Sequence, residues 1–198
     1  MSGIKQFDEA RALDGAMNVF WRNGFNATSY PALIAATGLN KSSLYNAFGD
    51  KQALYRRCLA RFAEVHGEKL RMRLNADRLE EAIGGFFDEL ISRFRRPDLP
   101  GGCMVTAAAL ELGSNNDMAG SCIGDQMREL EVLFRRRLDR GVRERELPAN
   151  TDTLSLASFL IAMTRGLAVL HRGYGDVRAV MRAKRTMMQI LRAPPIKR

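Results

Sequence analysis

The segment from Gly24 to Lys51 restricts the fold more than any other part of the sequence, because residues that end helices and residues that start them alternate there at short intervals. Thr28-Ser29-Tyr30-Pro31 offers a hydroxyl cap with proline in the first turn, and Gly38 is suited to end that helix. Asn40 can cap a second helix, and Gly49-Asp50-Lys51 then stops that helix and caps another. The segment therefore predicts two short helices joined by a tight turn.

Gly38 is placed to end the first short helix in the left-handed conformation. If it forms a Schellman motif, Leu39 follows it directly and falls against Ile34, which is the apolar contact that this motif carries. The second short helix then runs from Lys41 to about Ala47.

The rest of the chain is predicted to be helical as well. Sustained alternation of β-branched residues is missing, whereas apolar residues recur at steps of three and four. We expect an all-α fold of about nine helices. The longer ones lie at about residues 8–23, from Asp50 toward Leu74, at Leu79 to Phe94, at Met104 to Leu112 before Gly113-Ser114-Asn115-Asn116, at Met127 to Leu138, and twice within about 151–192.

Composition is that of a soluble globular protein, with 46% hydrophobic and 27% charged residues. We expect no apolar run of about 18 or more residues that could span a membrane, and the charged N-terminus lacks the pattern of a secretory signal. Cys58, Cys103 and Cys122 show no metal-ligand spacing, and their odd number argues against a disulfide framework. These features favour a cytoplasmic protein.

Residues for catalysis or metal binding do not cluster in the sequence. His66 and His171 are far apart, and neither lies in a local pattern typical of a zinc site or a catalytic triad. We therefore expect structural or surface histidines, no metal and no cofactor.

A formal net charge of +9 suggests a polyanionic partner, but the charge is spread along the chain. Residues 1–60 contain seven Lys and Arg against four Asp and Glu, which leaves +3 of the total there. Charge alone does not locate a nucleic-acid site.

The two short helices match a helix-turn-helix. A helix that enters the major groove must be short, must present polar side chains near its N-terminus, and needs a partner helix that lies across the phosphates. Lys41, Ser42, Ser43 and Tyr45 would face outward together, which an ordinary helical corner does not require.

The segment Ile34 to Leu54, preceded by Thr28-Ser29 and by Gly24-Phe25, resembles the signature of TetR-type transcriptional regulators. The resemblance covers roughly residues 7–56 and is architectural beyond them. It implies a helix-turn-helix DNA-binding domain of three helices over residues 1–50. A helical-bundle domain for ligand binding and dimerisation would follow over residues 51–198.

The resemblance also implies roles for individual residues. Ser29 and Tyr30 would touch phosphates, Lys41, Ser42 and Ser43 would lead the recognition helix into the groove, and Asn40 would stand at its start. Tyr45 would reach phosphate and base surface, while Lys51 would grip the backbone. Asn46-Ala47 replaces the histidine or other large residue that many relatives carry, so Asn46 would supply its own contact. A dimer of this kind binds a pseudo-palindromic operator.

In the second domain, the resemblance implies an apolar or aromatic effector and a coupling through the long helix that begins after Asp50. The last two helices, about 151–192, would meet their copies as a four-helix bundle, although they could also only complete the monomer core. Predicted pocket residues, each of which could equally be plain core, are Phe86, Phe87, Leu90, Phe94, Cys103, Met104, Ala107, Met127, Leu130, Phe134 and Met163.

Cys103 follows Gly101-Gly102 and opens a segment similar to that of TetR-type regulators in which a cysteine responds to electrophiles or oxidants. A helix N-terminus favours the thiolate form. The alternative is a buried cysteine that acts as a small hydrophobe.

The sequence thus predicts a dimeric, ligand-responsive DNA-binding repressor that is not an enzyme. Two other functions remain open. A small-molecule-binding or thiol enzyme could use the bundle pocket, and a nonspecific architectural protein could bind DNA, although the modest charge of residues 1–60 disfavours the latter.

Overall fold

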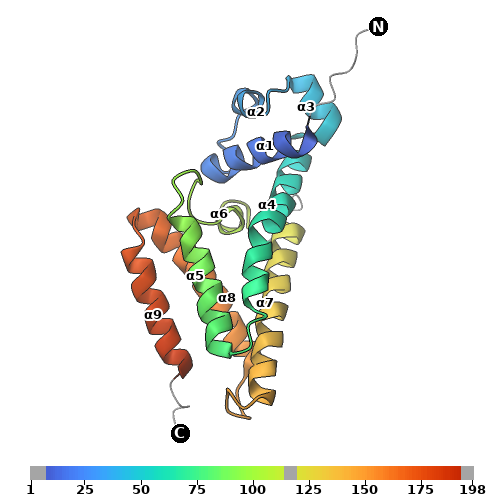
Figure 1. Ribbon diagram of the computed structural model, residues 1–198. Coiled ribbons are helices and arrows are strands. Elements are labelled where there is room, and N and C mark those ends of the chain that lie inside the picture. Colours follow the sequence, from blue (N-terminus) through green and yellow to red (C-terminus); the bar gives the residue numbers. More distant parts are fainter. Residues whose placement is uncertain (1–7, 114–119, 193–198) are drawn as a thin grey trace.

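The computed structural model describes residues 8–113 and 120–192, and in these ranges the chain folds into nine α-helices and no strands. Figure 1 shows an elongated molecule with the three N-terminal helices at one end and most of the other helices packed lengthwise below them, except for one short helix that is seen nearly end-on. The helices are α1 (Glu9–Asn23), α2 (Tyr30–Thr37), α3 (Lys41–Phe48), α4 (Lys51–Arg73), α5 (Leu79–Phe94), α6 (Met104–Leu112), α7 (Gly120–Arg143), α8 (Thr153–Tyr174) and α9 (Arg178–Arg192). The predicted all-α class is confirmed.

Side-chain caps fix the short N-terminal helices as the sequence predicts. Ser29 Oγ accepts from the backbone N–H of Ala32 at 3.4 Å at the start of α2, and Asn40 Oδ1 accepts from that of Ser43 at 2.8 Å at the start of α3. The Asp50 carboxylate caps α4 in the same way. Each cap satisfies an amide that has no partner inside its helix, so α2 and α3 begin at defined residues.

The turn between α2 and α3 differs from the predicted Schellman motif. Gly38 is left-handed, with φ of 70°, and its N–H donates to the Ile34 carbonyl at 2.9 Å, as in the simpler left-handed cap. The N–H of Leu39 donates instead to Thr37 Oγ1 at 3.2 Å. That hydroxyl itself donates to the Leu33 carbonyl at 2.8 Å. The threonine side chain therefore takes the place of the second backbone bond.

Two hydrophobic clusters fill the interior. The first joins α1 to α4 with α6 and the start of α7, and its buried residues include Trp21, Phe62 and Met104. The second lies among α5, α7, α8 and α9, and Phe134 is fully buried in it between Phe86 and Phe87. Because the first cluster continues past residue 50, the N-terminal helices rest on a core that they share with the body of the protein.

Helix α8 corrects one expectation from the sequence. Residues Thr153–Tyr174 are long and apolar enough, by length and composition, to cross a membrane, with a mean hydropathy of 1.7 over the apolar window. Only 28% of that window is buried within one chain. The sequence pattern concealed this because small residues, threonine and serine separate the large apolar side chains.

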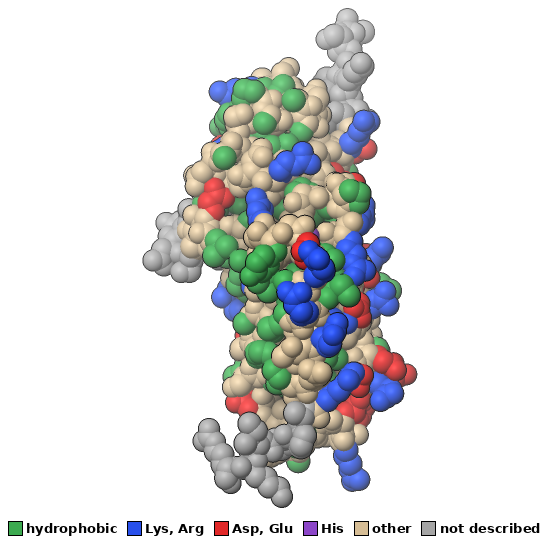
Figure 2. All heavy atoms as spheres, turned by 90° about the vertical axis from the view of Figure 1, so that its left-hand side faces the viewer, with side chains coloured by type: hydrophobic (Ala, Val, Ile, Leu, Met, Phe, Trp, Pro, Cys, Tyr) green, Lys and Arg blue, Asp and Glu red, His purple; other side chains and the backbone are tan. Residues whose placement is uncertain are grey.

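Figure 2 looks onto the side of the molecule that carries α9, where hydrophobic side chains gather and Lys and Arg lie along one flank. Large hydrophobic side chains on α8 and α9 are exposed in the single chain: Leu154, Val169, Tyr174, Met181 and Ile190. Such a patch is typical of a surface that another protein covers.

Candidate DNA-binding surface and ligand cavity

Helix α3 presents polar side chains outward while its apolar side chains anchor it. Leu44 and Phe48 are buried, whereas Lys41, Ser42 and Tyr45 are exposed, the tyrosine by 62%. An exposed tyrosine on a helix of eight residues adds nothing to the core. The helix therefore offers a hydroxyl, an ammonium and an aromatic ring to a partner.

The other predicted contact residues lie at the same end of the molecule. Ser29 and Asn40 are exposed caps, and Asn46 is exposed on α3. Ser43 and Tyr30 are partly buried, and the Lys41 ammonium lies 4.9 Å from the centre of the Tyr30 ring. This cation–π contact links the start of α2 to the start of α3, so the two helix N-termini are held next to each other.

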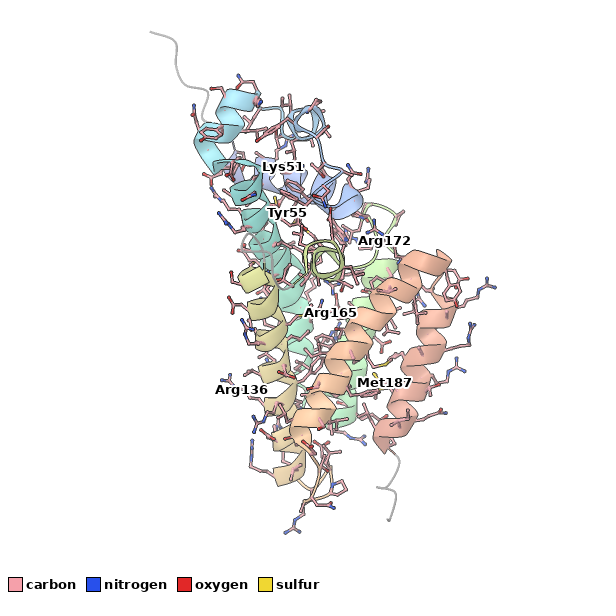
Figure 3. The ribbon with its side chains drawn as sticks, turned by 180° about the vertical axis from the view of Figure 1, so that it is seen from behind. Lys51, Tyr55, Arg136, Arg165, Arg172 and Met187 are labelled. Carbon is pink, nitrogen blue, oxygen red and sulfur yellow. The ribbon has the colours of Figure 1, made fainter. Side chains whose placement is uncertain are left out.

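Lys51 begins α4 directly beneath the short helices, as Figure 3 shows. Its ammonium lies 4.6 Å from the centre of the Phe25 ring, which also contacts Tyr55 at 5.1 Å between ring centres. Tyr55 is buried, and burial raises the pKa of its hydroxyl far above the usual value. The lysine is thus placed by a rigid aromatic cluster.

A cavity of about 680 Å³, including its open mouth, lies between α4, α5, α6, α7 and α8. This volume includes solvent space at the mouth, and the part that water molecules can enter is about 90 Å³. Most of the surface of its wall is apolar, although its charged or polar lining residues are as numerous as the apolar ones: His66, Arg71, Arg93, Cys103, Gln126, Glu129, Thr164 and Arg165.

The structure places the predicted pocket residues in different surroundings. Phe86, Leu90, Cys103 and Leu130 line the cavity, and Ala107 lines a second one with Cys103. The side chains of Phe87, Phe94, Met104 and Phe134 are buried in the two hydrophobic clusters. Met127 and Met163 are partly buried against those clusters. The cavity thus collects a minority of these residues.

Sequence analysis missed the charged residues of the cavity. The pocket residues predicted from the sequence are apolar apart from Cys103, whereas Arg93 on α5 and Arg165 on α8 also line the cavity. A signal was available in Arg165, because it follows Thr164 inside the apolar stripe of α8.

His66 is a partly buried histidine in an aromatic corner. Its ring lies 5.1 Å from that of Trp21 and 4.8 Å from that of Phe62, measured between centres. Burial, followed by the nearby positive charges of Arg93 and Arg96, lowers the pKa of His66 to about 4. The imidazole is therefore neutral at pH 7.

Cys103 stands at the start of α6 and lines both cavities. Arg165 Nη1 donates to its sulfur at 3.3 Å and approaches Thr106 Oγ1 at 3.5 Å. Figure 3 shows Arg165 in the interior of the bundle, just below α6. All three cysteines are free thiols, and burial raises the pKa of Cys58.

Helix α6 also holds the N-terminal helices. The backbone N–H groups of Phe25 and Asn26 donate to the two carboxylate oxygens of Glu111 at 2.8 and 2.6 Å. Arg172 on α8 adds a hydrogen bond of 3.1 Å to the Arg22 carbonyl, close to α6 and α1 in Figure 3. We call the Glu111 contact the α6 clamp. Its residues connect the second cavity to the end of α1.

Among the described residues, no group of three or more His, Cys, Asp or Glu side chains could hold a metal ion. The geometry is instead that of a DNA-binding regulator: a helix-turn-helix with exposed polar side chains stands on a helical bundle with a cavity.

Comparison with known proteins gives the same class. Residues 12–58 match the family of bacterial regulatory proteins of the tetR family, and residues 76–187 match the Tetracyclin repressor-like C-terminal domain. The chain belongs to the TetR family of transcriptional regulators. Regulators of this family are soluble intracellular proteins that act as dimers with small-molecule effectors.

Individual relatives cover nearly the whole chain. The HTH-type transcriptional repressor ComR of Escherichia coli K12 is 29% identical over 94% of this chain and 90% of its own length. A cysteine mutant of the regulator CifR, solved in complex with a 26bp double-strand operator DNA, is 33% identical, with a TM-score of 0.85 over 97% of this chain and all of its own. The reduced form of Escherichia coli NemR is 18% identical and shares the fold, with a TM-score of 0.81 over 96% of this chain and all of its own.

Proposed function

We propose that this protein is a cytoplasmic, homodimeric repressor that binds a pseudo-palindromic operator and leaves it when an effector occupies the bundle cavity. The observation that carries the proposal is the exposed polar surface of α3, fixed at its start by the Asn40 cap and anchored by Leu44 and Phe48. Membership of the family and the operator complex of the relative CifR support it.

In this proposal residues 1–50 form the DNA-binding part and residues 51–198 the effector and dimerisation part, of which 1–7, 114–119 and 193–198 lie outside the described residues. Lys41, Ser42, Ser43, Tyr45 and Asn46 face the major groove from α3, with Asn40 at its start. Ser29, Tyr30 and Lys51 contact phosphates, where helix N-termini and an ammonium meet the anionic backbone.

The dimer forms through α8 and α9, about residues 151–192. The support is the exposed apolar surface of these helices and the small buried share of the apolar window of α8. Covering this surface with a second copy would bury it without a membrane. One recognition helix of each copy then reaches one half-site.

Effector binding reaches DNA by a shift between two positions of the N-terminal helices. The α6 clamp supports this route, because Glu111 holds Phe25 and Asn26 while the same helix lines both cavities. An effector that favours another position of α6 would move the clamp, and its differential affinity for the two positions would set the response. This route adds to the coupling expected along α4.

The effector is small and apolar or aromatic, in keeping with the cavity wall. An electrophile is a second candidate, because Cys103 opens α6 and faces both cavities. A band-shift titration of the wild type and Cys103→Ser, with and without N-ethylmaleimide, tests this candidate. Loss of operator binding in the wild type alone supports it, whereas identical responses rule it out.

An enzyme that uses the cavity is not favoured. The lining residues include one neutral histidine, one thiol and the carboxylate of Glu129 beside three arginines, and no hydrogen bond among the described residues joins that carboxylate to the histidine or the thiol. We infer that the protein is a regulator without catalytic activity.

Selection of bound sequences from random duplexes tests the proposed function. We expect a pseudo-palindrome with two half-sites about one helical turn or a multiple apart. A protein that bound every duplex equally at physiological salt would refute the proposal and favour the architectural alternative.

A further inference from the structure

Two arginines line the cavity without a carboxylate partner. Arg93 Nη1 donates to the His66 carbonyl at 2.9 Å, and Arg165 Nη1 donates to Cys103 Sγ. Neither guanidinium forms an ion pair with any acidic side chain in residues 8–113 and 120–192. In both residues Nε is buried and has no hydrogen-bond partner within those ranges.

The acidic residues nearby are engaged elsewhere. Glu129, the acidic residue in the cavity wall, lies 3.8 Å from Arg71, and its side chain is 59% exposed. Glu89 lies 3.2 Å from Arg73. The lining residues therefore bring three arginines against one carboxylate, and that carboxylate lies on the solvent side.

This excess of positive charge is energetically unfavourable within the chain itself. Burial lowers the pKa of Arg93; the charges of Cys103 and Glu89 oppose this shift, and the positive charge of Arg165 adds to it more weakly. A buried charge without a counter-charge destabilises the fold, and buried donors without acceptors add to that cost. The two arginines are also close enough to each other to interact.

A third arginine shows how the same chain treats a buried guanidinium that serves the fold. Arg137 is 4% exposed, and its Nη2 donates to Glu146 Oε1 at 3.0 Å and to the Asp77 carbonyl at 2.8 Å. Glu146 in turn accepts from the backbone N–H of Leu79 at 2.6 Å. The Nε and Nη1 atoms of Arg137 are also buried without a partner, so the difference lies in the counter-charge: Arg137 pairs with Glu146, whereas Arg93 and Arg165 have no ion pair among the described residues.

We propose that the effector is an organic carboxylate, whose anionic head lies on Arg93 and Arg165 and whose apolar body lies against Phe62, Leu90, Leu130 and Leu133. Guanidinium groups bind carboxylates through paired, charge-assisted hydrogen bonds, and the unpartnered Nε atoms supply donors for them. The inference rests on the proposed function and specifies the chemical class of the effector.

The cavity favours a carboxylate with a body of aromatic or medium-chain size. Its wall is mostly apolar, so a small inorganic anion would leave that surface uncovered. His66 is neutral and adds no charge to the site at pH 7.

The experiment compares carboxylates with their uncharged amides on the full chain at pH 7.5. Isothermal titration would use 2-naphthoate against 2-naphthamide and octanoate against octanamide. We expect at least one acid to bind about tenfold or more tightly than its amide, because hydrogen bonds from a guanidinium to a carboxylate are stronger than those to a neutral amide. Equal binding of acid and amide in both pairs, or binding by no acid, would overturn the inference.

Variants assign the head group to the two arginines. Arg93→Gln and Arg165→Gln should each weaken acid binding about tenfold and leave amide binding unchanged, while Arg93→Lys and Arg165→Lys should keep part of the preference for the acid. Arg96→Gln is the matched control, because Arg96 is exposed and pairs with Asp98 just beyond α5. Equal weakening of acid and amide by the glutamine variants would also overturn the inference.

Operator binding shows whether a negative result contradicts the carboxylate effector alone or the proposed function as well. Each variant is checked for its helix content and for binding to the selected operator. A wild type that binds the operator but not the carboxylates contradicts only the carboxylate effector. A wild type without a preferred operator contradicts the proposed function, whatever the carboxylates do.

Discussion

In the N-terminal helices the polar side chains proposed to touch DNA lie outside an apolar core, whereas the arginines of the cavity lie inside one. Tyr45 and Lys41 are exposed, and the residues beneath them, such as Leu44, are apolar. Around the cavity, Arg93 and Arg165 reach inward past apolar side chains. The exposed polar side chains of the N-terminal helices leave the stability of the fold unaffected. The inward-facing arginines of the cavity reduce it.

The largest effect should come from Arg137, which is buried, when it is compared with the partly buried Arg165. Arg137→Met should lower the free energy of unfolding by about 3 to 5 kcal/mol, because it leaves Glu146 without its partner. Arg165→Met should leave that free energy unchanged or raise it, because it removes an uncompensated charge. Urea denaturation followed by circular dichroism measures both. Equal losses in the two variants would remove the distinction between structural and functional arginines.

At the DNA-binding end, Tyr45→Ala should weaken operator binding by about 1 to 3 kcal/mol without lowering the melting temperature. The side chain is 62% exposed, so its removal leaves no cavity. Fluorescence anisotropy with the selected operator measures the affinity. Met72→Ala, which removes a side chain of 63% exposure from α4, is the control and should change neither quantity. A melting temperature lowered by Tyr45→Ala alone would contradict the comparison.

The α6 clamp joins the two regions, and its loss should have an intermediate effect. Glu111→Ala removes the acceptor of the Phe25 and Asn26 amides, so their hydrogen exchange should become about tenfold faster, the equivalent of about 1.4 kcal/mol. Glu68→Ala, at an exposed position of α4, should leave those rates unchanged. Unaltered exchange in Glu111→Ala would show that the clamp does not hold the end of α1.

The pH dependence of the free energy of unfolding tests the surroundings of His66, which lies between the two regions. Because the pKa of His66 falls from 6.5 in the unfolded chain to about 4 in the fold, the unfolded chain binds the extra proton between these values. Stability should therefore fall as the pH drops from 6.5 to 4. His66 contributes about 1 to 2 kcal/mol to this change in the free energy of unfolding, once the partial exposure of its ring is discounted.

His66→Phe keeps an aromatic ring against Trp21 and should flatten this part of the curve. Thermal melts of both proteins at several pH values measure the difference. The same slope in the variant and the wild type would assign the pH dependence to other groups.

Lys51→Ala should have the smallest effect. It should weaken binding to all duplexes alike and reduce the slope of log affinity against log salt by about one unit. Lys69→Ala, at an exposed position farther along α4, should keep the wild-type slope. A loss confined to the selected operator would assign Lys51 to base contacts instead of the phosphates.

The difference between the regions also explains what the sequence could predict. The caps at Ser29, Asn40 and Asp50 depend on residues three positions apart, so they are confirmed at the predicted places. Within the turn, the Thr37 hydroxyl accepts the N–H of Leu39 in place of a backbone carbonyl. The Schellman motif predicted from Gly38 does not include such a side-chain bond.

The cavity could not be predicted in the same way. Its wall comes from five helices, and the burial of Arg93 and Arg165 depends on how those helices pack. On each helix separately, an arginine beside an apolar stripe has the pattern of a solvated residue. The aromatic residues at helical spacing were equally suited to core and cavity, and most of them are core.

The α6 clamp has a consequence for the construction of hybrid regulators. Gly24 has φ of 80°, and a Cβ there would lie 2.6 Å from Glu111 Oε2, so the end of α1 is fitted to an acidic residue more than eighty positions away. A graft of residues 1–50 onto the body of another regulator would separate these two surfaces. A biosensor that uses residues 1–50 of this protein should therefore keep Gly24 together with Glu111. Without that contact, effector binding in the second domain would no longer change DNA binding.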